Sequence, residues 1–86
     1  MFTVGFLITF KSVTHAQSGG RVLSNNGILS HLVRPAAVLA RGSCGYALRL
    51  NAINAQKAVY LLRQKNVPFA GTFYELPGGE IKEAKL

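Results

Sequence analysis

Residues 4–10 read VGFLITF, and this stretch decides how the rest of the chain can fold. The run is short, almost wholly apolar and rich in residues that favour β-strands, which predicts a strand buried on both faces. A strand that is buried on both faces lies in the middle of a sheet. We therefore predict that residues 4–10 form the central strand and that the other elements are arranged around it.

The residues that follow predict a helix and then a second strand. Ser12 and Thr14 are candidate N-caps, because their side-chain oxygens can accept hydrogen bonds from the first helical turn. The sequence NNG at residues 25–27 tolerates the left-handed backbone that ends many helices. Residues 28–33 then predict a strand, which Pro35 terminates. The face of the helix that we expect to pack on the sheet contains Ala16, Gly19, Gly20 and Leu23.

The second half of the chain predicts another strand and another helix. Residues 45–50 are rich in strand-forming residues. Either Asn51 or Asn54 can cap the helix that follows, which runs to about Lys65 and has apolar residues spaced three and four apart.

Residues 67–76 predict a fourth strand, and Pro68 and Gly71 favour a position at the edge of the sheet, because proline lacks the N–H that a central strand needs. The segment after it, residues 77–86, is polar and begins with PGG. We predict a disordered tail for 77–86. Residues 1–76 are then expected to form a single domain.

The expected element order is β-α-β-β-α-β. This is the order of the ferredoxin-like split unit, an α+β two-layer sandwich in which two helices cover one face of an antiparallel sheet. Right-handed crossovers and a central first strand predict the spatial strand order 4-1-3-2.

The charge of the chain is almost entirely positive. Ten Lys and Arg stand against three Asp and Glu in 86 residues, which gives a net charge of +7. All three acids, Glu75, Glu80 and Glu83, lie near the end of the sequence. Residues 1–74 contain basic residues and no acids, and such a surface attracts anions. Nucleic acid, an acidic protein or a small anion are therefore candidate partners.

The cysteine count excludes several kinds of site. One Cys cannot form an internal disulfide, a CxxC pair or an iron–sulfur cluster, and with two His it does not supply the four ligands of a structural zinc site. We predict no metal site. The apolar run that ends at Lys11 is about half as long as a membrane span and lacks the features of a signal peptide. We therefore expect a cytoplasmic protein, without membrane association, whose thiol stays reduced.

Cys44 lies in the sequence GSCG, at the start of the third predicted strand. In the predicted topology this point lies beside the end of the first strand, so the turn at residues 11–15 should border the thiol. The helix N-terminus there and Arg41 would stabilise a thiolate and lower the pKa of the thiol. The alternative is a buried, unreactive cysteine, since free Cys is among the most buried residue types.

Other candidate site residues surround Cys44. His15 is a candidate base for the thiol, and the alternative is a surface histidine that helps to cap the helix. Arg49 is expected on the same side of the third strand as Gly45, and the alternative is a solvated arginine on the sheet face. The remaining candidate binding residues are Ser12, Thr14 and Ser43.

The chain resembles the Se/S carrier-like family of small bacterial domains over about residues 4–76. The most specific motif is SCGYALR at residues 43–49, which is similar to the family's SCGLALR signature. FLITF at 6–10 leading into THA at 14–16, and KNV at 65–67 with Gly71 and Tyr74, are also similar. The segment RPAA at 34–37 replaces the family's PxPR.

The resemblance implies that Cys44 carries sulfur or selenium as a persulfide or selenopersulfide. The protein would then be a carrier that exchanges this atom with donor and acceptor proteins, with no cofactor beyond the covalent persulfide. A different hypothesis is a non-catalytic binding module that uses the basic surface for RNA or an acidic protein partner. Exposed strands at the sheet edges could also pair with a second copy of the chain, so a homodimer is possible.

Overall fold

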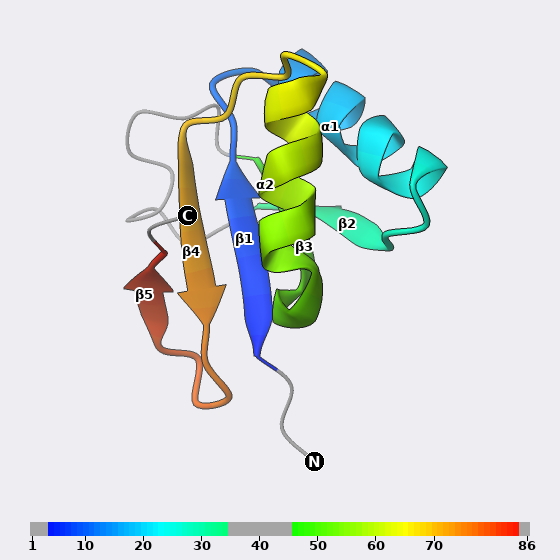
Figure 1. Cartoon of the computed structure of the whole chain (residues 1–86). Helices are drawn as coiled ribbons and strands as arrows, with labels where there is room; N and C mark the ends of the chain where they lie inside the picture. Colours follow the sequence, from blue (N-terminus) through cyan, green and yellow to red (C-terminus); the bar gives the residue numbers. More distant parts are fainter. Residues whose placement is uncertain (1–3, 35–45, 85–86) are drawn as a thin grey trace.

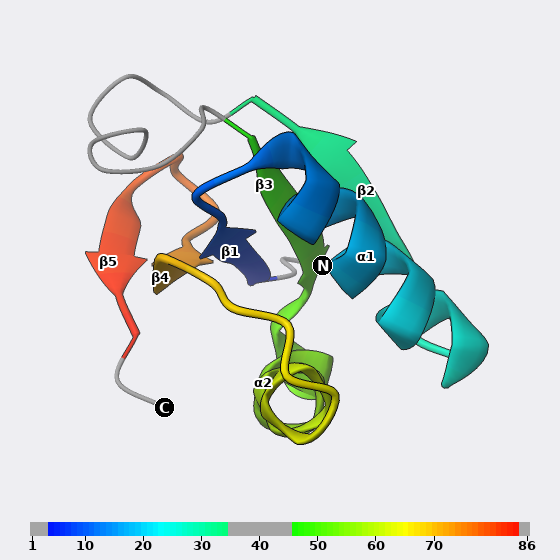
Figure 2. The same ribbon diagram turned by 90° about the horizontal axis from the view of Figure 1, so that it is seen from above.

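The computed structural model describes residues 4–34 and 46–84. These residues form a five-stranded antiparallel sheet in the order β2-β3-β1-β4-β5, with both helices on one face (Figures 1 and 2). The elements in chain order are β1 (Gly5–Thr9), α1 (Val13–Asn25), β2 (Ser30–Val33), β3 (Ala47–Asn51), the 3₁₀ turn η1 (Ala52–Asn54), α2 (Ala55–Gln64), β4 (Gly71–Glu75) and β5 (Ile81–Glu83).

The central position predicted for the first strand is confirmed. β1 pairs with β3 on one side and with β4 on the other. Phe6 and Ile8 point into the core beneath the helices, and both are completely buried. Leu7 and Thr9 alternate onto the opposite face and are also buried, at 3% and 2% exposure. Both faces of β1 are therefore withdrawn from water, as the continuous apolar run predicts.

The predicted strand order 4-1-3-2 is wrong, because the sheet contains a fifth strand. The four expected strands keep their relative order, but β4 is an inner strand and β5 pairs with it, with Tyr74 opposite Lys82. Pro68 precedes β4 by three residues, so its missing N–H does not interrupt the pairing with β5. The edge position expected for the fourth strand is also wrong, because β4 lies between β1 and β5.

The disordered tail predicted for 77–86 is wrong at residues 81–83, which form β5. The PGG sequence closes a hairpin between β4 and β5, in which Gly79 has a φ of 86° that favours glycine. Thr72 fixes the far end of this hairpin. Its hydroxyl donates to the Ala84 carbonyl at 2.8 Å, and the Ala84 N–H donates to the Thr72 carbonyl at 2.9 Å.

The expected cap of the first helix is present, but neither candidate asparagine caps α2 with a side-chain hydrogen bond. Ser12 is the N-cap of α1, and its hydroxyl accepts a hydrogen bond from the His15 N–H at 3.2 Å. The Asn51 side chain accepts from the Ile53 N–H at 3.0 Å and caps η1. Asn54 occupies the N-cap position of α2 without a side-chain hydrogen bond. Each predicted helix therefore begins within a few residues of its expected cap.

Gly19 brings α1 close to the sheet. A Cβ placed at Gly19 would lie 3.0 Å from Cζ of Phe10 and 3.2 Å from Cδ1 of Leu48, so these side chains would have to shift by a few tenths of an ångström. A Cβ at Gly20 would lie 3.5 Å from Leu48, which is an ordinary contact. The close approach expected from the two glycines is thus specific to Gly19.

This difference makes the two glycines a matched pair of test positions. Gly20→Ala should raise the free energy of unfolding by up to about 1 kcal/mol, because alanine favours the helix. Gly19→Ala has the same gain in helix propensity, but the added methyl group overpacks the core, which lowers the free energy of unfolding by about 1–3 kcal/mol. We expect urea denaturation followed by circular dichroism to find Gly19→Ala less stable than Gly20→Ala by that amount. Equal stability of the two variants would contradict the close approach at Gly19.

Candidate functional site

The pairing of β1 with β3 defines one end of the sheet as the candidate site. Thr9, the last residue of β1, lies opposite Ala47, the first residue of β3. Val33, the last residue of β2, lies on the other side of Ala47. The expectation that the third strand starts beside the end of the first is therefore confirmed. Of the predicted site residues, Arg41, Ser43, Cys44 and Gly45 lie outside the described residues.

The N-terminus of α1 follows β1 at this same end. Ser12 caps the helix, Thr14 is exposed and His15 is partly buried. The His15 ring nitrogen Nδ1 is buried and has no hydrogen-bond partner within residues 4–34 and 46–84. Because the backbone N–H of His15 makes the capping bond, the imidazole is not needed for the cap. The three predicted residues are thus neighbours on the first turn of α1.

Arg49 has a different environment from the one expected. Its Nη2 lies 2.6 Å from Oε1 of Glu75, so the guanidinium forms an ion pair with the strand on the far side of β1. Glu75 is opposite Gly5, at the end of β1 that lies away from α1. The structure therefore does not bring the Arg49 charge together with Ser12 and His15.

The ion pair passes over Gly5, the one β1 residue without a side chain, and a Cβ there would crowd the Glu75 carboxylate. A Cβ at Gly5 would lie 3.1 Å from Glu75 Oε1 and 3.7 Å from Arg49 Nε. Sequence reasoning missed Glu75 as the partner of Arg49. The only signal was that the three acids are concentrated near the end of the sequence, which did not indicate which basic residue each would pair with.

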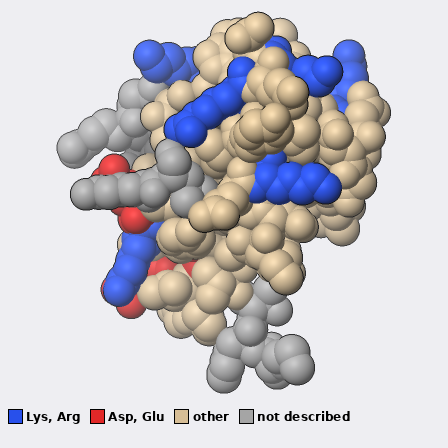
Figure 3. Space-filling view, viewed as in Figure 1, with Lys and Arg blue, Asp and Glu red and all other residues tan. Residues whose placement is uncertain are grey.

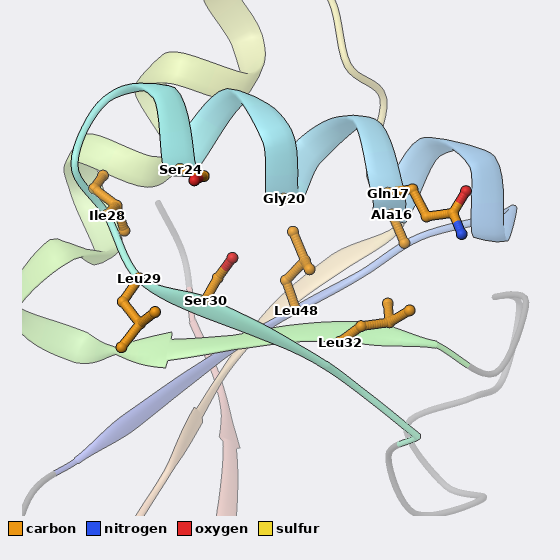
Figure 4. Close-up of a pocket in the computed structure, with 9 residues that line it drawn as sticks. All are labelled: Ala16, Gln17, Gly20, Ser24, Ile28, Leu29, Ser30, Leu32 and Leu48. Atoms are coloured by element: carbon orange, nitrogen blue, oxygen red, sulfur yellow. The ribbon is translucent and has the colours of Figure 1, made fainter.

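In the described part of the chain, a groove between α1 and β2 is lined by no group suited to thiol chemistry. Its volume is about 280 Å³, and Leu48 points from the sheet toward Gly20 at its centre (Figure 4). The lining is aliphatic with a few neutral polar groups, and none of these residues is titratable. It consists of Ala16, Gln17, Gly20, Ser24, Ile28, Leu29, Ser30, Leu32 and Leu48.

The described residues also contain no group of three or more His, Cys, Asp or Glu side chains placed to hold a metal ion. Within the same part of the chain, no helix is long and apolar enough to cross a membrane.

A two-layer α+β domain with two helices on an antiparallel sheet is consistent with the ferredoxin-like class of folds. The chain belongs to the family described as "Putative Se/S carrier protein-like", whose model matches residues 5–74. That range runs from the start of β1 almost to the end of β4 and includes Cys44, so the resemblance noted from the sequence motifs is confirmed. Neither a curated protein nor a solved structure matches the chain.

Proposed function

We propose that this protein carries sulfur or selenium on Cys44 as a persulfide or selenopersulfide. The observation that supports this is membership of the Se/S carrier-like family over residues 5–74, in a chain with a single cysteine. The partners would be proteins that donate or accept sulfur or selenium. A thiol that must stay reduced to accept the atom is suited to the cytoplasm.

The proposed loading step exchanges one bond for another. The Cys44 thiolate attacks the outer sulfur of a donor persulfide, and the bond between the two donor sulfurs breaks. The donor's inner sulfur leaves with the electron pair and becomes a thiol when it takes a proton. In the second step an acceptor nucleophile attacks the outer atom on Cys44 and releases the Cys44 thiolate. No external oxidant or reductant is needed in either step.

The strand pairing supports the surroundings that we propose for Cys44. Ala47 is three residues beyond Cys44 and lies opposite Thr9, after which the chain turns into α1. The N-terminus of α1 favours negative charge, so Ser12, Thr14 and the free N–H groups there are proposed to stabilise the anionic sulfur. His15 is proposed to accept the thiol proton. Arg41, Ser43 and Gly45 complete the proposed site. Arg49 is left out, because it is paired with Glu75.

Loading can be measured directly by mass spectrometry of the intact protein. After incubation with a persulfide donor, we expect the mass to rise by that of one sulfur atom and to return to its starting value after treatment with a reducing thiol. Cys44→Ser should gain nothing, because the chain has no other cysteine. Absence of added mass, under conditions that load an established carrier, would contradict the proposal.

A further inference from the structure

The acids of this protein are gathered on one hairpin, where Lys82 also lies, and most of the basic residues lie elsewhere. The three acids belong to β4, to β5 and to the turn between them. Figure 3 shows red acidic side chains on the left, over this hairpin, and blue basic side chains mainly over the upper part and the right. The upper part is where β1 and α2 both end in the same view (Figure 1).

Three basic residues lie at the end of the molecule where β1 and α2 stop. Lys11 follows β1 by two residues, Arg63 is in the last turn of α2 and Lys65 is the C-cap of α2. All three are exposed. The Ala70 N–H donates to the Thr9 carbonyl at 2.6 Å, which joins the segment after α2 to the end of β1. We call Lys11, Arg63 and Lys65 the basic rim.

A shallow groove of about 480 Å³ lies beside the basic rim, at the end of α2. Val67 and Phe69 contribute half-buried apolar surface to it, and Leu62 lies completely buried beneath. The Arg63 guanidinium carbon lies 5.9 Å from the centroid of the Phe69 ring. The groove is lined by Leu62, Arg63, Asn66, Val67, Pro68 and Phe69.

We propose that this groove and the basic rim form the docking surface for an acidic protein that delivers sulfur or selenium or takes it away. An apolar side chain of that protein would enter the groove, and its carboxylates would contact the rim. Protein interfaces commonly combine an apolar centre with a polar rim, and complementary charges steer the encounter. The inference rests on the proposed carrier function for the nature of the partner.

The groove favours a protein over a nucleic acid. Proteins that bind single-stranded nucleic acids stack successive bases on several aromatic side chains. Among the residues that the structure describes, Phe69 is the one aromatic residue that lines this groove. An acidic peptide segment with one apolar anchor matches both the apolar lining and the charge of the rim.

The test is a titration of isotope-labelled Cys44→Ser protein, followed by NMR. The probe is a short synthetic peptide rich in Asp and Glu with one central Leu. We expect the largest shift changes at Lys11 and over residues 62–69, with little change at Arg21 or Lys57. Lys65→Glu should weaken binding at least about tenfold. Lys57→Glu, the same charge change in the first turn of α2, should leave it nearly unchanged.

Three results would overturn the docking surface. The first is shift changes that extend equally over Arg21 and Lys57, because binding would then be general charge attraction. The second is equal affinity for a peptide whose Leu is replaced by Ser, because the groove would have no role. The third is tighter binding of a poly-uridine oligonucleotide at the same residues. Since the titrated protein lacks the thiol, each of these outcomes leaves the loading result on Cys44 standing.

Discussion

Phe10→Ala is expected to lower the free energy of unfolding by about 3–5 kcal/mol, the usual cost of removing a buried phenylalanine ring. Phe10 is completely buried where β1 turns toward α1. Its ring lies against Gly19, so α1 would lose packing against the end of the strand. A domain of this size has only about 5–15 kcal/mol of stability, so a large part of the total would be lost.

Urea denaturation followed by circular dichroism measures this effect, with Tyr60→Ala as the matched control. Tyr60 is also aromatic, but its side chain on α2 is 61% exposed. Truncation of an exposed side chain that makes no special contact usually changes stability by less than about 0.5 kcal/mol. A midpoint for Phe10→Ala close to that of Tyr60→Ala would contradict the packing of α1 against β1.

His15→Asn is expected to slow the loading of Cys44 about a hundredfold near neutral pH, within the usual range for loss of a general base. The final extent of loading should stay the same, because the cysteine is intact. The rates of the variant and of the unmodified protein should converge at alkaline pH, where the thiolate forms without a base. The backbone N–H of His15 makes the bond to Ser12, so the substitution leaves the helix cap in place.

His31→Asn is the matched control for this experiment. His31 is the other histidine of the chain and lies exposed on β2. Loading is followed by stopping the reaction at intervals and measuring the intact mass. If the two variants load at equal rates at every pH, the role of His15 as a base is refuted and the alternative of a structural residue at the helix N-terminus stands.

The elements that the sequence predicted well are those with strong local patterns. β1 is a continuous apolar run, and α1 begins at a serine cap and ends just before Gly27. β5 has only Ile81 as an apolar residue, and its position depends on hydrogen bonds between Thr72 and Ala84. Those bonds join residues that are 12 positions apart in the sequence, which local periodicity does not detect. Pro68 led to the wrong prediction of an edge strand, because the sequence did not show that β4 begins three residues after the proline.

The candidate site was predictable to the extent that topology determines it. The element order was enough to place the start of β3 beside the end of β1, and the pairing of Thr9 with Ala47 confirms this. The partner of Arg49 was not predictable, because Glu75 reaches it across an intervening strand and shares no motif with it. The reactivity of Cys44 and the roles of Arg41, Ser43 and Gly45 stay predictions.

The ion pair over Gly5 also has a consequence for how sequences of this kind can change. The pair joins β3 to β4 above β1, and it needs the space that a side chain at position 5 would fill. A side chain at position 5 would crowd the Glu75 carboxylate, and without the ion pair this constraint on position 5 is removed. Positions 5, 49 and 75 are therefore expected to change together among homologues, although they are distant in the sequence.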